Sequence, residues 1–358
     1  MYVKWCVIDL CVYSFICLWE KQTLTYQRVE AFIRNHGPLG IMRYNYLDIK
    51  KMTNTFKYKL GQGGYGGVYK KLKYGCFVTM KVLKESKGNG EEFLNKVASN
   101  SRTSYVYIVT LMGFCFEYSK RVLIYKFMPN GSLEKFIYKY FSTNVDCQLV
   151  WETSYKIAVG IAQGLKYLNR GCNTRILHFD IKPPNILLDE NFCLKISNFG
   201  IAKICSREES IISMVGTRTV GYIALELFCR NFGGVSHKSN VYNYGLMVLE
   251  MIGGRKNIGV SVDRTSEIYF PHWIYKHIEL DEELRLQGLI NKEDEESARK
   301  TIIVSLWCTQ TDPSGQLSMS KVVYMLEESL DFLQMPPKPF LSSLPRTPVD
   351  SSTTMILL

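Results

Sequence analysis

Short apolar runs separated by glycine and polar residues occupy the chain between residues 56 and 128. Three of them, residues 67–69, 77–80 and 122–125, are rich in β-branched and aromatic side chains. Runs of this length and composition predict strands, whereas residues 91–101 predict one helix. We therefore expect a small sheet with a single helix in this part of the chain.

From about residue 131 the apolar positions follow a helical period. Ile157, Ile161, Leu165 and Leu168 recur at steps of four, four and three, which makes one apolar stripe. A β-rich segment followed by a helical one predicts an α+β chain of two lobes, over 56–128 and 129–333. The prolines and serines of residues 334–358 predict a disordered tail.

Residues 5–19 form an apolar stretch with one charge, Asp9. Fifteen helical residues reach about 23 Å, short of the ~30 Å hydrocarbon core, and the first four residues extend this to a marginal span. Residues 20–60 carry eight basic side chains against three acidic ones. By the positive-inside rule, we expect 1–19 to be a membrane anchor, 20–55 a basic juxtamembrane segment, and the remainder cytosolic. The alternatives are a signal-like apolar region or a buried helix in a cytoplasmic protein.

Composition narrows the class of protein. The chain has 358 residues, of which 46% are hydrophobic and 22% charged, so it is globular and long enough for two lobes. Its eleven cysteines show no Cys-x-x-Cys spacing, which argues against a zinc site or a disulfide scaffold and favours a reducing compartment. The net charge of +11 has no basic-aromatic stripe beside it, so we predict no nucleic-acid partner.

A glycine-rich segment, residues 61–68, contains the pattern G-x-G-x-x-G at Gly61, Gly63 and Gly66. A dinucleotide-binding turn would continue as a helix, but Val68 and the residues after it continue as a strand. Glycine lets backbone N–H groups approach phosphates without a Cβ in the way. The segment alone leaves two alternatives open, a phosphate-binding flap and a structural turn.

Further along, four features follow in a fixed order. Lys81 lies in an apolar strand, where an ammonium group is costly unless it meets an anion. Residues 178–185 then bring Asp180, Lys182 and Asn185 into one turn-rich segment, and the triplets 198–200 and 224–226 follow. Each feature is common by itself, but the ordered set is specific.

This ordered set resembles the protein kinase family over about residues 56–330. More narrowly, residues 43–53, 178–183 and 336–340 look like plant receptor-like kinases of the leaf-rust-resistance type. Lys182, two residues after Asp180, is similar to serine/threonine kinases rather than tyrosine kinases. The resemblance implies a bilobal α+β fold, ATP as nucleotide, Mg²⁺ (or Mn²⁺) as metal, and a protein substrate.

The resemblance also implies a role for each matching residue. Asp180 would orient the substrate hydroxyl and accept its proton, and Lys182 would steady the γ-phosphate. Asn185 would hold Mg²⁺, together with the residue at position 198. The implied nucleotide-binding residues are Gly61, Gly63, Gly66, Val68, Lys81, and, in the hinge that meets adenine, Lys126 and Met128.

Two departures from the family pattern concern the chemistry. Asn198 stands where the family has a metal-binding aspartate, so one negative charge next to a dication is gone. Lys96 stands where a glutamate pairs with the strand lysine, which would set two ammonium groups facing each other. A shifted helix could instead present Glu92 to Lys81. We therefore expect impaired turnover.

Other departures concern the scaffold, and each is expected to cost stability. Asn100 would put an amide in an apolar position, and Gln316 would leave a carboxylate near 226 without its arginine. Asn240 replaces an aspartate that holds the catalytic loop, and Leu225 replaces a proline. Phe179 replaces the arginine that usually receives a phosphate, so activation by phosphorylation at Ser206, Ser210, Ser213 or Thr217 is not expected.

Two functions remain open from the sequence. The first is a receptor-like serine/threonine kinase that binds ATP and transfers its γ-phosphate slowly to protein. The second is a catalytically inactive pseudokinase, a binding module that regulates a partner kinase. The intact glycines, Lys81 and Asp180 favour the first, whereas Lys96 and Asn198 favour the second.

Overall fold

The fold is taken from a computed structural model of the chain. Beyond short pieces elsewhere, the structure describes residues 41–63, 66–73, 76–83, 91–117, 120–137, 149–171, 174–205, 236–254, 291–310, 315–329 and 333–337. The N-terminal lobe (N-lobe) contains β1 (Met42–Arg43), α2 (Tyr46–Met52), β2 (Lys59–Gly63), β3 (Gly66–Lys73), β4 (Cys76–Leu83), α3 (Glu91–Ser101), β5 (Leu111–Glu117) and β6 (Lys120–Lys126).

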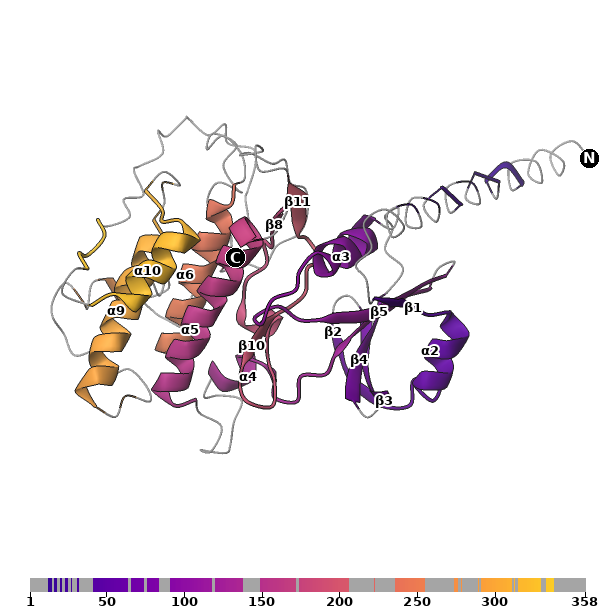
Figure 1. Ribbon diagram of the computed structural model, residues 1–358, viewed down its shortest axis with the longest axis horizontal. Coiled ribbons are helices and arrows are strands. Elements are labelled where there is room, and N and C mark those ends of the chain that lie inside the picture. Colours follow the sequence, from indigo (N-terminus) through magenta and orange to yellow (C-terminus); the bar gives the residue numbers. More distant parts are fainter. Residues whose placement is uncertain are drawn as a thin grey trace, which may run out of the picture.

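The C-terminal lobe (C-lobe) is built mainly from helices. Its elements are β7 (Gly131–Ser132), α4 (Glu134–Ile137), α5 (Trp151–Lys166), the π-helix η3 (Tyr167–Gly171), β8 (Arg175–Leu177), the 3₁₀-helix η4 (Pro183–Asn185), β9 (Ile186–Leu188), β10 (Leu194–Ile196), β11 (Lys203–Cys205), α6 (Lys238–Gly253), α9 (Lys292–Cys308) and α10 (Met319–Glu327). Figure 1 shows the sheet with α2 and α3 on one side of the molecule and α5, α6, α9 and α10 on the other. The predicted two-lobed α+β fold is confirmed.

The N-lobe sheet has the strand order β1-β5-β6-β4-β3-β2, and β2 to β6 pair antiparallel. Strands alternate their side chains between two faces, so the sheet has two apolar clusters. Phe93 of α3 packs with Phe114 and Leu123 in one cluster, whereas Val78 and Met80 belong to the other. The predicted helix over 91–101 is present as α3.

Residues 42–52 also belong to the N-lobe. β1 pairs parallel with β5, and Ile49 of α2 is fully buried in the same cluster as Val78 and Met80. Asn45 caps α2 by accepting a hydrogen bond from the Asp48 N–H at 2.7 Å. The sequence placed this stretch inside the basic segment 20–55, but the structure packs it on the sheet because its apolar side chains cover one face.

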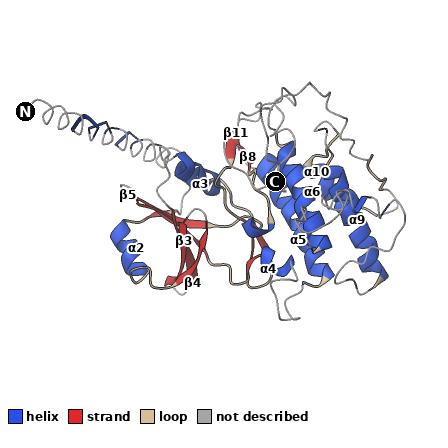
Figure 2. Ribbon diagram, turned by 180° about the vertical axis from the view of Figure 1, so that it is seen from behind, coloured by secondary structure: helices blue, strands red, loops and turns tan. Residues whose placement is uncertain are grey.

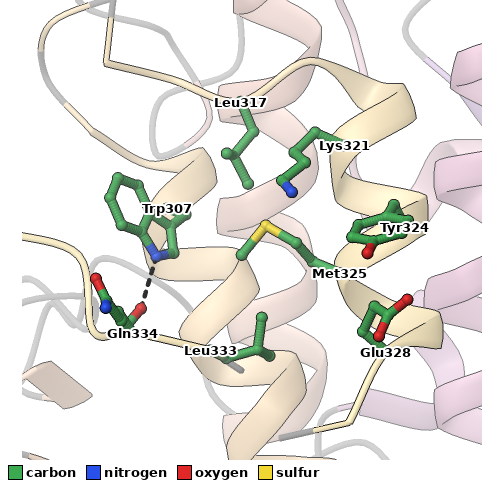
Figure 3. Close-up of a pocket in the computed structure, with 8 residues that line it drawn as sticks. All are labelled: Trp307, Leu317, Lys321, Tyr324, Met325, Glu328, Leu333 and Gln334. Atoms are coloured by element: carbon green, nitrogen blue, oxygen red, sulfur yellow. Dashed lines mark hydrogen bonds between the residues drawn. The ribbon is translucent and has the colours of Figure 1, made fainter. Parts of the chain in front are cut away.

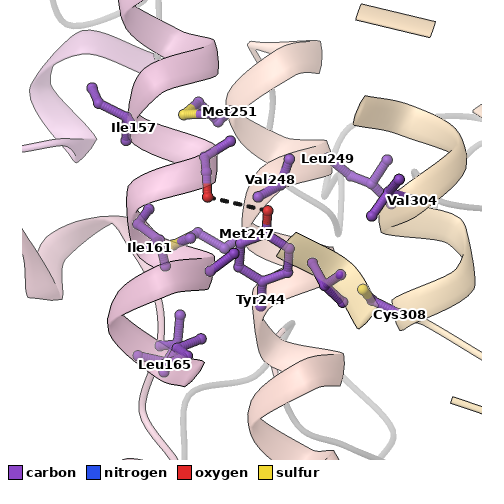
Figure 4. Packing of buried hydrophobic residues seen from close by; sticks show 14 of the residues in the cluster. Ile157, Ile161, Leu165, Tyr244, Met247, Val248, Leu249, Met251, Val304 and Cys308 are labelled. Atoms are coloured by element: carbon purple, nitrogen blue, oxygen red, sulfur yellow. Dashed lines mark hydrogen bonds between the residues drawn. The ribbon is translucent and has the colours of Figure 1, made fainter. Parts of the chain in front are cut away.

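The C-lobe core lies between α5, α6 and α9 (Figure 4). The predicted stripe is confirmed, since Ile157, Ile161 and Leu165 of α5 are buried, and Leu168 follows in η3. They meet Tyr244 of α6, whose hydroxyl donates to the Ala158 carbonyl at 3.2 Å. This hydrogen bond satisfies a polar atom inside an apolar core.

Little of the N-terminal region is described. Within residues 1–40 the structure describes residues 12–14, 16–17, 20, 23–24, 27 and 31, which are helical and exposed. None of the described helices has the length and apolar character needed to cross a bilayer. Most of the predicted anchor, residues 1–19, and most of the predicted tail, residues 334–358, lie outside the described residues.

Candidate functional site

The glycine-rich segment contributes to two paired antiparallel strands, β2 and β3. In the β2–β3 hairpin Gly61 is opposite Val68, and Gly63 is opposite Gly66. The chain continues as strand after Gly66, as the sequence predicted, and this differs from the strand-turn-helix of a dinucleotide-binding turn. On the other side of β3, Val68 is opposite Lys81 of β4. The sheet register therefore sets the lysine beside the glycine-rich hairpin.

Short strands of the C-lobe hold the segment that carries Asp180, Lys182 and Asn185. It runs from β8 into the turn η4, where Pro183 and Pro184 begin the turn and the Asn185 N–H donates to the Lys182 carbonyl at 2.9 Å. β9 and β10 pair antiparallel, and the Ser197 N–H then donates to the Asn185 carbonyl at 2.9 Å. In Figure 2 this region lies between the N-lobe sheet and the C-lobe helices.

Five side chains predicted for the site form one hydrogen-bonded chain, which we call the cleft network. Lys81 Nζ donates to Asn198 Oδ1 at 3.3 Å, and Asn198 Nδ2 donates to Asn185 Oδ1 at 3.0 Å. Asn185 Nδ2 donates to Asp180 Oδ2 at 2.8 Å, and Lys182 Nζ lies 2.8 Å from Asp180 Oδ1. Residues separated by more than a hundred positions therefore converge, as the ordered motifs predicted.

Lys96 lies next to this network. It belongs to α3 and is only 2% exposed. A Cβ added at Gly200 would lie 3.8 Å from Lys96 Nζ and 3.6 Å from Asn198 Oδ1, so both atoms border the same point. A cation thus stands beside the network where the resemblance implied a carboxylate. The side chain of Glu92, the alternative partner for Lys81, lies outside the described residues.

His178 and Asn240 make hydrogen bonds that hold the segment around Asp180 in place. His178 is fully buried, with Nε2 2.8 Å from the Ser197 carbonyl and Nδ1 accepting from the Asp180 N–H at 3.2 Å. Asn240 Oδ1 accepts from the Phe179 N–H at 2.8 Å. Phe179 has a φ of 60°, which bulky residues rarely adopt. The sequence predicted that Asn240, in place of an aspartate, would hold this loop less well. The amide oxygen of Asn240 nevertheless accepts the hydrogen bond from the Phe179 N–H, so this contact is kept.

Removing the Asn240 acceptor is expected to destabilise the fold. In Asn240→Ala the buried Phe179 N–H loses its partner, and we expect the free energy of unfolding to fall by about 2 kcal/mol. Asn240→Asp keeps an acceptor in the same place and serves as the control. Urea denaturation of both variants measures the difference, and equal losses would show that the hydrogen bond to Phe179 does not matter.

One buried histidine, His178, and one half-buried histidine, His237, predict that the fold is sensitive to acid. Burial lowers the pKa of His178, although Asp180 opposes the shift, and burial with nearby Lys238 lowers the pKa of His237 to about 4. Unfolded imidazoles bind a proton near pH 6.5, so the unfolded state takes up more protons as the pH falls. Stability is therefore full above this pH and declines below it.

We expect the melting temperature to fall between about pH 7 and about pH 5. His237→Gln should remove about 1 kcal/mol of that decline, a value reduced for its partial exposure. Thermal melting across this range measures both. A stability curve that is flat, or that rises as the pH falls, would contradict the assignment of two neutral histidines.

The predicted hinge connects the lobes. The Lys126 N–H, at the end of β6, donates to the Thr110 carbonyl at 3.3 Å, and its ammonium is exposed, 3.9 Å from Glu190 Oε1. Met128 is 6% exposed and its carbonyl accepts from the Gly131 N–H at 3.1 Å. Neither side chain belongs to the cleft network.

Asn100 is buried, as the sequence predicted, and Gln316 is buried as well. Asn100 Nδ2 donates to the Lys96 carbonyl at 2.7 Å, and Gln316 Nε2 donates to the Gln310 carbonyl at 2.8 Å. The amide oxygen of each is buried without a hydrogen-bond partner in the described part of the chain. Such atoms cost stability. Ser206, Ser210, Ser213, Thr217, Leu225 and Glu226 lie outside the described residues.

A separate hollow of about 570 Å³ lies on the C-lobe, far along the chain from the cleft network. Figure 3 shows it between Trp307 of α9 and Met325 of α10, closed below by Leu333 and bordered by Lys321. Trp307 Nε1 donates to the Gln334 carbonyl at 2.8 Å. None of the site residues predicted from the sequence lines this hollow.

Comparison with known proteins agrees with the fold. The family model for the protein kinase domain matches residues 55–325, so the chain belongs to the protein kinase family. It is 53% identical over 324 residues to the PR5-like receptor kinase of Arabidopsis thaliana, covering 88% of this chain and 48% of the relative. It is 49% identical over 320 residues to the rust resistance kinase Lr10 of Triticum aestivum, covering 89% and 50%.

A third relative is the leaf rust 10 disease-resistance locus receptor-like protein kinase-like 2.3 of Arabidopsis thaliana. It is 50% identical over 341 residues, which cover 94% of this chain and 53% of the relative. The chain is thus similar to plant receptor-like kinases, as the sequence predicted. It spans about half the length of these relatives.

The sequence did not predict how extensively the side chains of the site residues hydrogen-bond to one another. Asn198 was recognised as a lost charge, but its amide nitrogen also donates to Asn185 and to Asp180 Oδ2, the latter at 3.4 Å. The spacing of Asp180, Asn185 and Asn198 was the available signal. It could not show which atom of the amide faces which neighbour, because that depends on the side-chain rotamer.

Proposed function

We propose that this chain is a receptor-like kinase domain that binds ATP beside the β2–β3 hairpin and transfers the γ-phosphate to protein serine or threonine only slowly. The cleft network carries the proposal, because it joins Lys81 of the N-lobe to Asp180 and Asn185 of the C-lobe. Gly61, Gly63, Gly66 and Val68 would cover the phosphates, and Lys126 with Met128 would meet adenine through the backbone.

Each residue of the network has a proposed task that suits its contacts. Lys81 would neutralise the α- and β-phosphates, and Asp180 would orient the attacking hydroxyl and accept its proton. Lys182, 2.8 Å from Asp180 Oδ1, holds that carboxylate and would steady the γ-phosphate. Phosphoryl transfer asks mainly for positioning and charge neutralisation, which these side chains supply.

Protein kinases normally use ATP together with Mg²⁺, which bridges and neutralises the phosphates. The proposed ligands here are Asn185 and Asn198, with Mn²⁺ as an alternative ion. Asn185 Oδ1 accepts from Asn198, and Asn198 Oδ1 accepts from Lys81, so both oxygens are engaged within the protein. This donor set does not fit a dication as it stands, and slow transfer is the expected consequence.

The same observation favours a second function. If Asn198 stays in its internal contacts, the domain would bind nucleotide without turnover and act as a pseudokinase that regulates a partner kinase. The buried cation at Lys96 supports this alternative, since the family glutamate is missing. The relatives' names make a membrane receptor the proposed setting, with residues 1–19 as its anchor and a cytosolic kinase domain.

Two measurements test the proposal. ATP should raise the melting temperature of the native chain, and Lys81→Met should remove most of this shift. Transfer of labelled γ-phosphate to a generic protein substrate should be slow and should disappear in Asp180→Ala. The absence of any ATP-dependent shift would refute nucleotide binding, and transfer that survives Asp180→Ala would refute the residue roles. A clear ATP-dependent shift of the melting temperature without any γ-phosphate transfer would favour the pseudokinase function.

A further inference from the structure

The side chain of Asn198 makes three polar contacts, and each suits an amide. Its oxygen accepts from Lys81 Nζ at 3.3 Å. Its nitrogen donates to Asn185 Oδ1 at 3.0 Å and lies 3.4 Å from Asp180 Oδ2. An amide nitrogen carries two hydrogens, so it serves two acceptors at once. The Asn198 amide therefore bridges the acidic and the amide side chains of the network.

A carboxylate at position 198 could not make these contacts. An ionised carboxylate only accepts hydrogen bonds, so its second oxygen would face two further acceptors, Asn185 Oδ1 and Asp180 Oδ2. Three acceptor oxygens at such distances repel one another unless a cation lies among them. The two N–H bonds of Asn198 supply the positive partners that a bound dication would otherwise supply.

The charged side chains around the network also differ from the family pattern. The described side chains there include three cations, Lys81, Lys96 and Lys182, and one anion, Asp180. Lys96 is almost fully buried, where an ammonium attracts anions strongly because little water screens it. Relative to the family pattern, Asn198 removes one negative charge, and Lys96 replaces another with a positive one.

From these two observations we infer that the cleft binds a nucleoside triphosphate free of divalent cation. The ammonium groups of Lys81 and Lys96 offset the phosphate charge, and the Asn198 amide takes the place of the ion among the oxygens. The inference rests on the proposed function, since it requires that ATP binds in this cleft. It concerns binding alone and adds no chemical step.

Calorimetric titration with ATP tests the inference, in one buffer containing excess EDTA and in another containing excess MgCl₂. For the native chain the two dissociation constants should agree within about threefold. Asn198→Asp should bind ATP at least about tenfold more weakly in EDTA than in MgCl₂. In this variant the oxygens of Asp180, Asn185 and the new carboxylate would face one another, and a cation among them would be required to offset their repulsion.

Lys96 is tested in the same way. Lys96→Met removes the charge but keeps the length and suits a buried position, and it should weaken binding in EDTA at least about tenfold. Lys96→Arg keeps the charge and should restore most of the affinity. Lys321→Met removes one charge from an exposed site on α10 and should change nothing, which controls for net charge. Melting curves without nucleotide show whether each variant is folded.

The outcomes separate the inference from the function on which it rests. Native binding that is at least about tenfold weaker in EDTA would overturn metal-free binding and leave the proposed function intact. Binding in neither buffer would overturn the proposed function itself. Equal native binding with unaffected Asn198→Asp and Lys96→Met would overturn the roles of both residues. If Lys96→Met does not fold, the affinities of Asn198→Asp in the two buffers still test the inference.

Discussion

Asn198→Asp is expected to raise γ-phosphate transfer from ATP by about a hundredfold or more when Mg²⁺ is supplied, which corresponds to about 2.7 kcal/mol of transition-state stabilisation. The substitution removes the N–H donors that now engage Asn185 Oδ1 and Asp180 Oδ2. It restores a hard anionic ligand beside them. The backbone tolerates the change, because position 198 has a φ of 65°, a conformation that asparagine and aspartate both adopt.

The controls separate chemistry from charge. Asn191→Asp makes the same substitution on an exposed residue and should leave transfer at the native level. Adding Asp180→Ala to Asn198→Asp should return transfer to background, because the proton acceptor is then missing. A rate of Asn198→Asp equal to the native rate would show that the neutral amide is not what limits transfer.

Gly245→Ala should be the most damaging small substitution in the C-lobe core, with an expected loss of about 3 kcal/mol. A Cβ at this position would lie 2.7 Å from the Ser305 carbonyl oxygen and 2.7 Å from Cys308 Cβ. The carbonyl is backbone of α9, so no flexible side chain can move aside. The two helices would have to separate, which disturbs the packing around Tyr244.

Chemical denaturation of the purified chain measures this effect. Gly315→Ala is the matched control, because Gly315 is exposed and its new Cβ would have only an ordinary contact, 3.5 Å from the Asp312 carbonyl oxygen. The control should unfold within about 0.5 kcal/mol of the native chain. If Gly245→Ala were equally stable, the close contact of α6 with α9 would not hold in solution.

The local pattern of residues predicted part of the secondary structure. The runs 67–69, 77–80 and 122–125 predicted β3, β4 and β6, and the period of Ile157, Ile161 and Leu165 predicted α5. The stretch 42–52 was not separated from the basic segment before it. Its Ile49 becomes apolar core only when the sheet is present to cover it, and charge counting cannot detect a long-range contact of that kind.

The sequence by itself predicted the candidate site residues, because the glycine segment, Lys81, Asp180 and Asn185 occur in an order and spacing that is improbable by chance. It also identified Lys96 and Asn198 as departures. Only the tertiary structure decided that these side chains form one closed network and that Asn240 still holds the Phe179 N–H. The reason is physical: spacing fixes the type of each group, whereas the direction of a hydrogen bond depends on rotamers and on neighbours from distant parts of the chain.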